Sequence, residues 1–174
     1  MKRLPDQKFA QSLLEPPKSI NRGHFDQFLD APYSRKIHRR VYCYGHSSYD
    51  LWNRLEVDSD LSYFNEDPPK ISISAADKIT SVQPAFVAKM RDKAVVANFK
   101  ASESDSDSIA TDILRLALTN WSEQFGIGIR IWTPNLLRKN VVWLANIKQL
   151  LRYVCRTDSH AKSKVEVDVT TIKT

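Results

Sequence analysis

The apolar residues of the second half of the chain change their spacing in a fixed order, and this order is the strongest constraint on the fold. Two strand-like runs at residues 82–90 and 94–100 flank a charged turn, which predicts an antiparallel hairpin. Residues 109–121 then carry apolar side chains at helical period, residues 127–132 form a buried strand, and Pro134 starts a second helix. Strand, helix, strand and helix in this order predict a right-handed crossover.

The residues before this segment are expected to add one helix and two further strands to the domain. Ser47 and Ser48 stand before apolar residues at helical spacing, which predicts a short amphipathic helix that a serine caps and that ends near Asp58. Strand-like runs at residues 61–64 and 70–74 flank a turn with two prolines. We therefore expect an α/β protein with a mixed central sheet flanked by helices.

The helix that Pro134 starts is expected to bury one face against the domain. Trp143 is expected in the core as well. The apolar face consists of Leu137, Val141, Leu144, Ile147 and Leu151.

The length of 174 residues and the hydrophobic content of 42% favour one globular domain with extensions. Residues 1–40 are rich in charge and proline, and we interpret them as a basic N-terminal arm that docks on a partner or on the domain. The domain itself is expected over residues 41–156. Residues 157–174 form a tail with alternating valines, which suits an edge strand or a strand added to a partner's sheet.

The chain is basic, with a formal net charge of +6 and a pI near 9.3. Such a charge favours a polyanionic partner, and nucleic acid in particular. Cys43 and Cys155 have no spacing typical of a zinc site or a disulfide framework, which favours a reducing cytoplasm. No segment approaches the ~20 apolar residues of a membrane span, so we expect no membrane association.

Two basic clusters are the candidate DNA-contacting residues. The alternative for each cluster is a solvated surface that binds nothing. The acidic loop at residues 101–108 is interpreted as a solvated helix cap, with a metal site or a phosphorylated switch as alternatives. The basic clusters are Arg35, Lys36, Arg39 and Arg40 near the N-terminus, and Arg138, Lys139 and Lys148 on the last helix.

Five short motifs follow one another between residues 42 and 153. In this order they resemble the TnsA family, the endonuclease subunits of heteromeric transposases. The resemblance implies a restriction-endonuclease-like fold, in which an acid on the first helix, an acid opening the second strand and a Glu or Gln two residues before a lysine on the third strand converge on Mg²⁺. The motifs are residues 55–58 (LEVD), 63–68 (YFNEDP), 83–86 (QPAF), 98–100 (NFK) and 138–148 (RKNVVWLANIK).

Carried over position by position, the resemblance implies a degenerate catalytic site. The helical acid falls on Ser48, the acid of the second strand on Ala85, and the Glu or Gln of the third strand on Asn98. The catalytic lysine is retained as Lys100. Because a hard cation is held chiefly by anionic oxygens, we expect no metal site, no Mg²⁺ cofactor and no phosphodiester hydrolysis.

Two alternatives to a natural loss of cleavage remain open. In the first, a nearby acid, Asp50, Glu66 or Asp77, takes the place of a lost ligand. In the second, Ala85 is an engineered substitution of an original Asp. The additional departure at Ser48 argues against a single engineered change.

The resemblance implies a DNA-binding, assembly-mediating subunit of a bacterial transposition complex that has lost cleavage. Its partners would be double-stranded DNA at a transposon end or target, together with the DDE-type transposase subunit; contact with the AAA+ transposition regulator stays open. One alternative is an active Mg²⁺-dependent endonuclease that cleaves the strand the transposase leaves uncut. Another is a DNA-free protein-interaction module of a mobile element.

Overall fold

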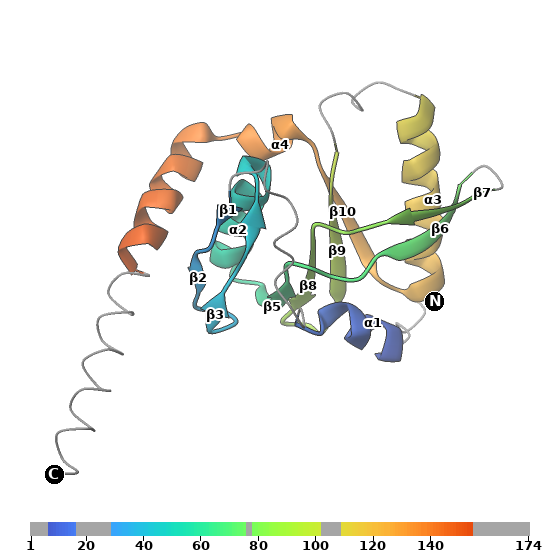
Figure 1. Cartoon of the computed structure of the whole chain (residues 1–174), viewed down its shortest axis with the longest axis horizontal. Helices are drawn as coiled ribbons and strands as arrows, with labels where there is room; N and C mark the ends of the chain where they lie inside the picture. Colours follow the sequence, from blue (N-terminus) through green and yellow to red (C-terminus); the bar gives the residue numbers. More distant parts are fainter. Residues whose placement is uncertain (1–6, 17–28, 76–77, 102–108, 155–174) are drawn as a thin grey trace, which may run out of the picture.

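The computed structural model describes residues 7–16, 29–75, 78–101 and 109–154. Four strands form its main sheet: β5 (Leu61–Asn65), β8 (Phe86–Met90), β9 (Val95–Lys100) and β10 (Gly128–Trp132). Their spatial order is β10, β9, β8, β5 (Figure 1). Neighbours among β5, β8 and β9 are antiparallel, whereas β10 runs parallel to β9. The expected α/β protein with a mixed sheet is confirmed.

Helices lie on both faces of this sheet (Figure 1). α1 (Gln7–Leu14) and α3 (Ile109–Phe125) pack on one face, and α2 (His46–Val57) packs on the other. α3 joins the parallel strands β9 and β10, as the predicted strand, helix, strand order requires. Because successive strand residues point to opposite faces, Val87 of β8 enters the core beneath α3, whereas Phe86 enters the core beneath α2.

β8 and β9 form the predicted antiparallel hairpin. In its turn, the backbone N–H of Lys93 donates to the carbonyl oxygen of Met90 at 3.0 Å. The Asp92 carboxylate accepts from the N–H of Ala94 at 3.0 Å, a local contact typical of aspartate in turns. Lys93 adopts a left-handed φ of 71°. The charged residues therefore close the hairpin through their own backbone and side-chain contacts.

The expectation of one strand over residues 82–90 is wrong. Its first residue belongs to β7 (Lys78–Val82), which pairs with β6 (Ile71–Ala75) in a separate antiparallel hairpin beside α3 (Figure 1). Pro84 lies between β7 and β8. Because proline has no backbone N–H, it cannot donate a ladder hydrogen bond, and the strand is interrupted there.

The last helix is also divided, contrary to expectation. α4 (Pro134–Arg138) is followed by a two-residue turn, and the helix resumes over residues 141–154. Thr133 caps α4, since its side chain accepts from the N–H of Leu136 at 3.2 Å. Asn140 has a φ of 65°, a left-handed conformation that helices do not continue through.

This break changes which side chains are buried. The three leucines of the expected apolar face are buried, and Ile147 is half-buried. Val141 is 65% exposed and Trp143 is 40% exposed, so the expected burial of these two residues is wrong. They lie in the first turn after the break, where the new helix leaves the line of α4.

α2 confirms the helix predicted before β5, but not its serine cap. The helix begins at His46 after Gly45, whose φ is 77°, and no side chain caps it. Glycine accepts this positive φ without a steric cost. Ser48 therefore lies inside the first turn of the helix, where it is buried.

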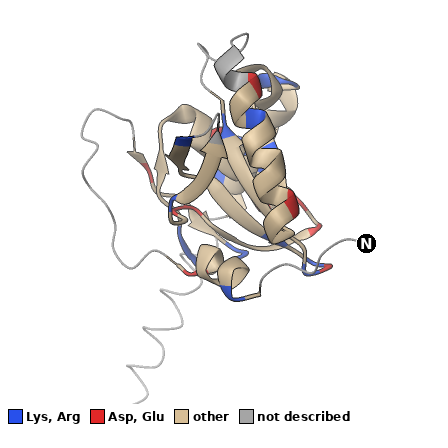
Figure 2. Ribbon diagram, turned by 90° about the vertical axis from the view of Figure 1, so that its right-hand side faces the viewer, with Lys and Arg blue, Asp and Glu red and all other residues tan. Residues whose placement is uncertain are grey.

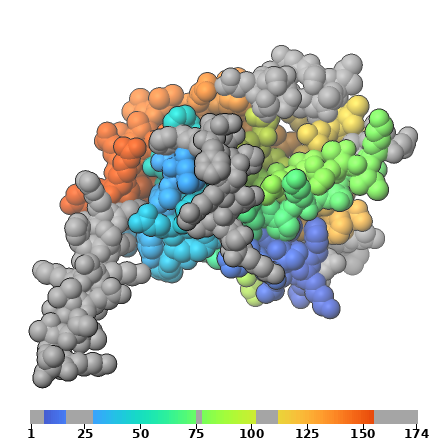
Figure 3. Space-filling model, in the orientation of Figure 1, coloured from blue at the N-terminus to red at the C-terminus, as the bar shows by residue number. Residues whose placement is uncertain are grey.

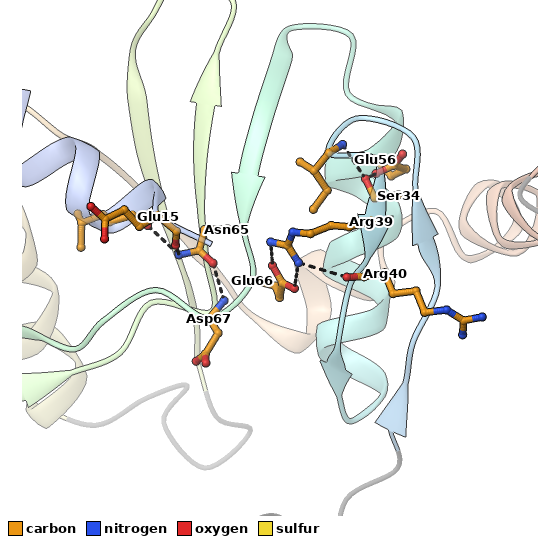
Figure 4. A network of polar contacts seen from close by, with 10 residues as sticks. Glu15, Ser34, Arg39, Arg40, Glu56, Asn65, Glu66 and Asp67 are labelled. Atoms are coloured by element: carbon orange, nitrogen blue, oxygen red, sulfur yellow. Dashed lines mark hydrogen bonds and ion pairs between the residues drawn. The ribbon is translucent and has the colours of Figure 1, made fainter. Parts of the chain in front are cut away.

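One part of the arm expected over residues 1–40 is the helix α1, which packs against the domain. It buries Ala10 and Leu13 in the core beneath α3. Asn65 of β5 holds the end of this helix, because its Nδ2 donates to the carbonyl oxygens of Leu13 at 3.0 Å and Glu15 at 2.8 Å (Figure 4). These contacts satisfy carbonyl groups that a helix end leaves without intrahelical partners.

The other described part of the arm forms short strands. β2 (Tyr33–Ser34) pairs with β3 (Arg39–Arg40), and β1 (Leu29–Asp30) pairs with β4 (Cys43–Tyr44). Val41 follows β3 and is fully buried in the core beneath α2. The hairpin of β2 and β3 is thereby attached to the domain at its base.

The expected tail over residues 157–174 and residues 102–108 of the acidic loop lie outside the described residues. Within the described ranges, no helix combines the length and the apolar character needed to cross a membrane.

Replacing Asn65 by Ala is expected to lower the free energy of unfolding by about 2 kcal/mol, because it removes buried hydrogen bonds to the end of α1. Urea denaturation followed by circular dichroism measures this change. Asn146→Ala, at an exposed position of the last helix, is the matched control and should shift it by less than about 0.5 kcal/mol. Equal effects of the two substitutions would contradict the role of Asn65.

Candidate functional site

The four positions carried over from the family resemblance lie on α2, β9 and the residue before β8. Ala85 immediately precedes β8, and its backbone N–H donates to the carbonyl oxygen of Asn98 at 2.7 Å. Asn98 and Lys100 are two residues apart on β9, so both side chains point to the α2 side of the sheet. Ala85 and Asn98 are therefore direct neighbours across the hairpin.

A hydrogen bond joins Lys100 to α2. The Nζ atom of Lys100 donates to Oγ of Ser48 at 2.6 Å, across 52 residues of sequence. The structure therefore brings Ser48, Ala85, Asn98 and Lys100 together where the first turn of α2 meets β8 and β9.

The side-chain oxygen atoms of Asn98 and Ser48 already accept hydrogen bonds within the fold. Oδ1 of Asn98 accepts from Nε1 of Trp132 at 2.9 Å, and the asparagine is 1% exposed. The hydroxyl of Ser48 accepts from Lys100, and Ala85 packs its methyl group against the core beneath α2. None of these side chains is a carboxylate, and Mg²⁺ needs anionic oxygens. The site residues do not fit the metal that the resemblance implies.

The acids that could replace a lost ligand have other partners. Asp50 forms an ion pair with Lys148, with 2.5 Å between Oδ1 and Nζ. The Glu66 side chain is 2% exposed and accepts two hydrogen bonds from the Arg39 guanidinium, one of them at 2.6 Å (Figure 4). Asp77 lies outside the described residues. Among the residues that are described, no three His, Cys, Asp or Glu side chains are grouped to hold a metal ion.

Burial lowers the pKa of Lys100, although the residue as a whole reaches the surface. Cys43 lies nearby, and burial raises the pKa of its thiol, which therefore stays neutral. Lys100 also lies at the first turn of α2, where the helix dipole disfavours a cation and favours an anion. The electrostatics of the site therefore suit a bound anion better than a bound cation.

Three of the seven predicted DNA-contacting residues are only partly exposed and are held by contacts to other elements of the fold. Arg39 pairs with Glu66, and the hydrogen bond to this carboxylate raises the pKa of Arg39. Lys36 donates from Nζ to the carbonyl oxygens of Asp58 and, at 3.0 Å, Leu61, and burial lowers its pKa. The third is Lys148, which pairs with Asp50 as described above. The exposed members of the set are Arg35, Arg40, Arg138 and Lys139.

Two residues that connect these elements were not singled out from the sequence. Arg54 of α2 donates from Nη2 to the carbonyl oxygens of Leu137 at 2.8 Å and Lys139 at 2.7 Å, and its guanidinium lies 5.3 Å from the ring centre of Trp143. It therefore holds α4 and the following helix against α2. No local pattern in the sequence indicates this role.

The second is Glu56, whose carboxylate is buried beneath the turn between β2 and β3. It accepts from the hydroxyl of Ser34 at 2.6 Å (Figure 4). It also accepts from the backbone N–H groups of Arg35 at 2.8 Å and Lys36 at 3.3 Å. Its only sequence signal is its place in the LEVD motif.

The chain matches no known family, and no curated protein is significantly similar to it in sequence.

Replacing Lys100 by Met is expected to raise the thermal midpoint at pH 7, because it removes the cost of burying an ammonium group. The pKa of Lys100 lies below 10.5 in the folded state and at 10.5 in the unfolded chain. Between these values the unfolded chain binds more protons than the folded chain. The stability of the wild type relative to the variant therefore increases as the pH rises toward 10.5. Thermal unfolding of both proteins from pH 7 to 10.5 measures the difference.

A Lys100→Met variant that is less stable than wild type at pH 7 would contradict this expectation. It would mean that the hydrogen bond to Ser48 stabilises the fold by more than the burial of the charge costs.

Proposed function

We propose that the chain is a degenerate TnsA-like subunit that binds DNA and mediates assembly of a transposition complex without cutting DNA. The observation that carries this proposal is the convergence of Ser48, Ala85, Asn98 and Lys100 at one place in the structure. The lysine of the family motif is present there, and the carboxylates are not.

The order of elements supports a restriction-endonuclease-like fold. One helix, three antiparallel strands, a second helix and a parallel strand occur in the order α2, β5, β8, β9, α3 and β10, with the β6–β7 hairpin inserted between β5 and β8. Ser48 is on the first helix, Ala85 opens the second strand, and Asn98 and Lys100 are on the third. These are the places that the resemblance assigns to the catalytic positions.

The chemistry of the site supports the loss of cleavage. Hydrolysis of a phosphodiester at such a site needs a metal ion that activates water and stabilises the developing charge. Ser48, Ala85 and Asn98 supply no anionic oxygen, and the amide oxygen of Asn98 already accepts from Trp132. What remains is Lys100, which suits contact with a phosphate group more than catalysis.

The charge of the chain supports nucleic acid as the partner. A net charge of +6 and exposed arginines and lysines at two places favour the DNA backbone. The transposon end or target, the DDE-type transposase subunit and the AAA+ regulator come into the proposal through the family resemblance alone. So does a location at the bacterial nucleoid in the cytoplasm.

A plasmid assay tests binding and cleavage together. The purified chain is expected to shift supercoiled plasmid, with an affinity that falls roughly a hundredfold between about 50 and 200 mM salt if about four phosphates are contacted. With Mg²⁺ or Mn²⁺ it should nick the plasmid no faster than a Lys100→Ala control. The combined variant Ser48→Glu, Ala85→Asp tests whether restored carboxylates bring metal-dependent nicking.

Metal-dependent nicking by the wild-type chain that the Lys100→Ala substitution abolishes would overturn the loss of cleavage and favour the active endonuclease. An absence of salt-dependent binding would favour the DNA-free interaction module.

A further inference from the structure

The hairpin of β2 and β3, residues 33–40, carries four of the basic residues, and its inner side is fixed to the domain. We infer that this hairpin is a preformed DNA-backbone-binding element, in which Lys36 and Arg39 anchor the hairpin and Arg35 and Arg40 contact phosphates. The inference rests on the proposed DNA-binding function and assigns that function to one surface.

Two buried carboxylates hold the hairpin from below. Glu56 accepts hydrogen bonds from Ser34, Arg35 and Lys36 at the start of the turn. Glu66 pairs with Arg39 on the returning strand, so both arms of the hairpin are attached (Figure 4).

Lys36 adds a third attachment. Its Nζ donates to two carbonyl oxygens, at Asp58 after the end of α2 and at Leu61 at the start of β5. A basic turn with this many fixed groups is ordered before any partner arrives. Preorganisation of this kind reduces the entropy lost on binding.

The strand register separates the two sides of the hairpin. Ser34 pairs with Arg39, and these two side chains point inward to Glu56 and Glu66. Tyr33 pairs with Arg40, and in Figure 4 the Arg40 side chain points away from the domain. Tyrosine and arginine are both common donors to DNA phosphates.

The charges divide in the same way. The inward cations, Lys36 and Arg39, are only partly exposed, whereas Arg35 and Arg40 are exposed. In Figure 3 the segment that contains the hairpin, coloured blue to cyan, reaches the surface on the same side of the molecule as the last helix. By contrast, the face over α1 and α3 carries both signs of charge interspersed (Figure 2).

The hairpin also lies near the candidate site. Cys43 of β4 is close enough to Glu66 and Lys100 that the charges of both act on its thiol. Glu66, the carboxylate that pairs with Arg39, and Lys100 therefore both lie near Cys43.

Two matched double variants test the assignment. Arg35→Gln with Arg40→Gln and Arg138→Gln with Lys139→Gln each remove two exposed positive charges, and fluorescence anisotropy with a duplex at graded salt measures binding. The hairpin variant is expected to weaken binding at least tenfold and to reduce the slope of log Kd against log salt by about 1.8. The α4 variant should weaken binding less than threefold and leave the slope unchanged. Unfolding temperatures close to wild type for both variants exclude loss of fold.

Equal weakening by the two variants, or a larger effect of the α4 variant, would overturn the inference and leave the proposed function standing. Failure of the wild-type chain to bind the duplex would overturn the proposed function and the inference with it. Wild-type binding to an acidic peptide with greater affinity than to DNA would show that the hairpin serves a protein partner, which also contradicts the inference.

Discussion

β8 and β9 are covered on both faces, and the rest of the structure depends on their register. Val87 and Ala97 fill the core beneath α3, whereas Phe86 fills the core beneath α2. A shift of one residue would exchange the two faces and remove these side chains from their cores. The same register directs Asn98 and Lys100 toward α2. The packing that stabilises the sheet therefore also positions the candidate site.

The elements that bury regularly spaced apolar residues could be predicted, because such spacing is visible over a short stretch of sequence. The β8–β9 hairpin, α3 and β10 belong to this class. The β6–β7 hairpin and the break after α4 do not. Pro84 and Asn140 each interrupt an otherwise regular apolar run through the conformation or hydrogen bonding of one backbone position, which the surrounding pattern conceals.

The site could be predicted only in part, because its contacts join residues that are distant in sequence. Ser48 and Lys100 were placed together by family resemblance, and no spacing rule would have paired them across 52 residues. The pairing of Arg39 with Glu66 and the contacts of Glu56 depend on how the β2–β3 hairpin folds over the domain. These contacts turn part of a basic sequence cluster into a structural anchor, and they leave the other part at the surface.

The central claim is that the residues around Lys100 bind no metal ion, although the protein binds DNA. Paramagnetic broadening by Mn²⁺ in the NMR spectrum of the ¹⁵N-labelled protein bound to DNA tests it most directly. The account predicts that the amides of Ser48, Ala85, Asn98 and Lys100 broaden no more than exposed amides of α3, since Mg²⁺ and Mn²⁺ share a preference for carboxylate ligands. Selective broadening of these four amides, reversed by excess Mg²⁺, would contradict it.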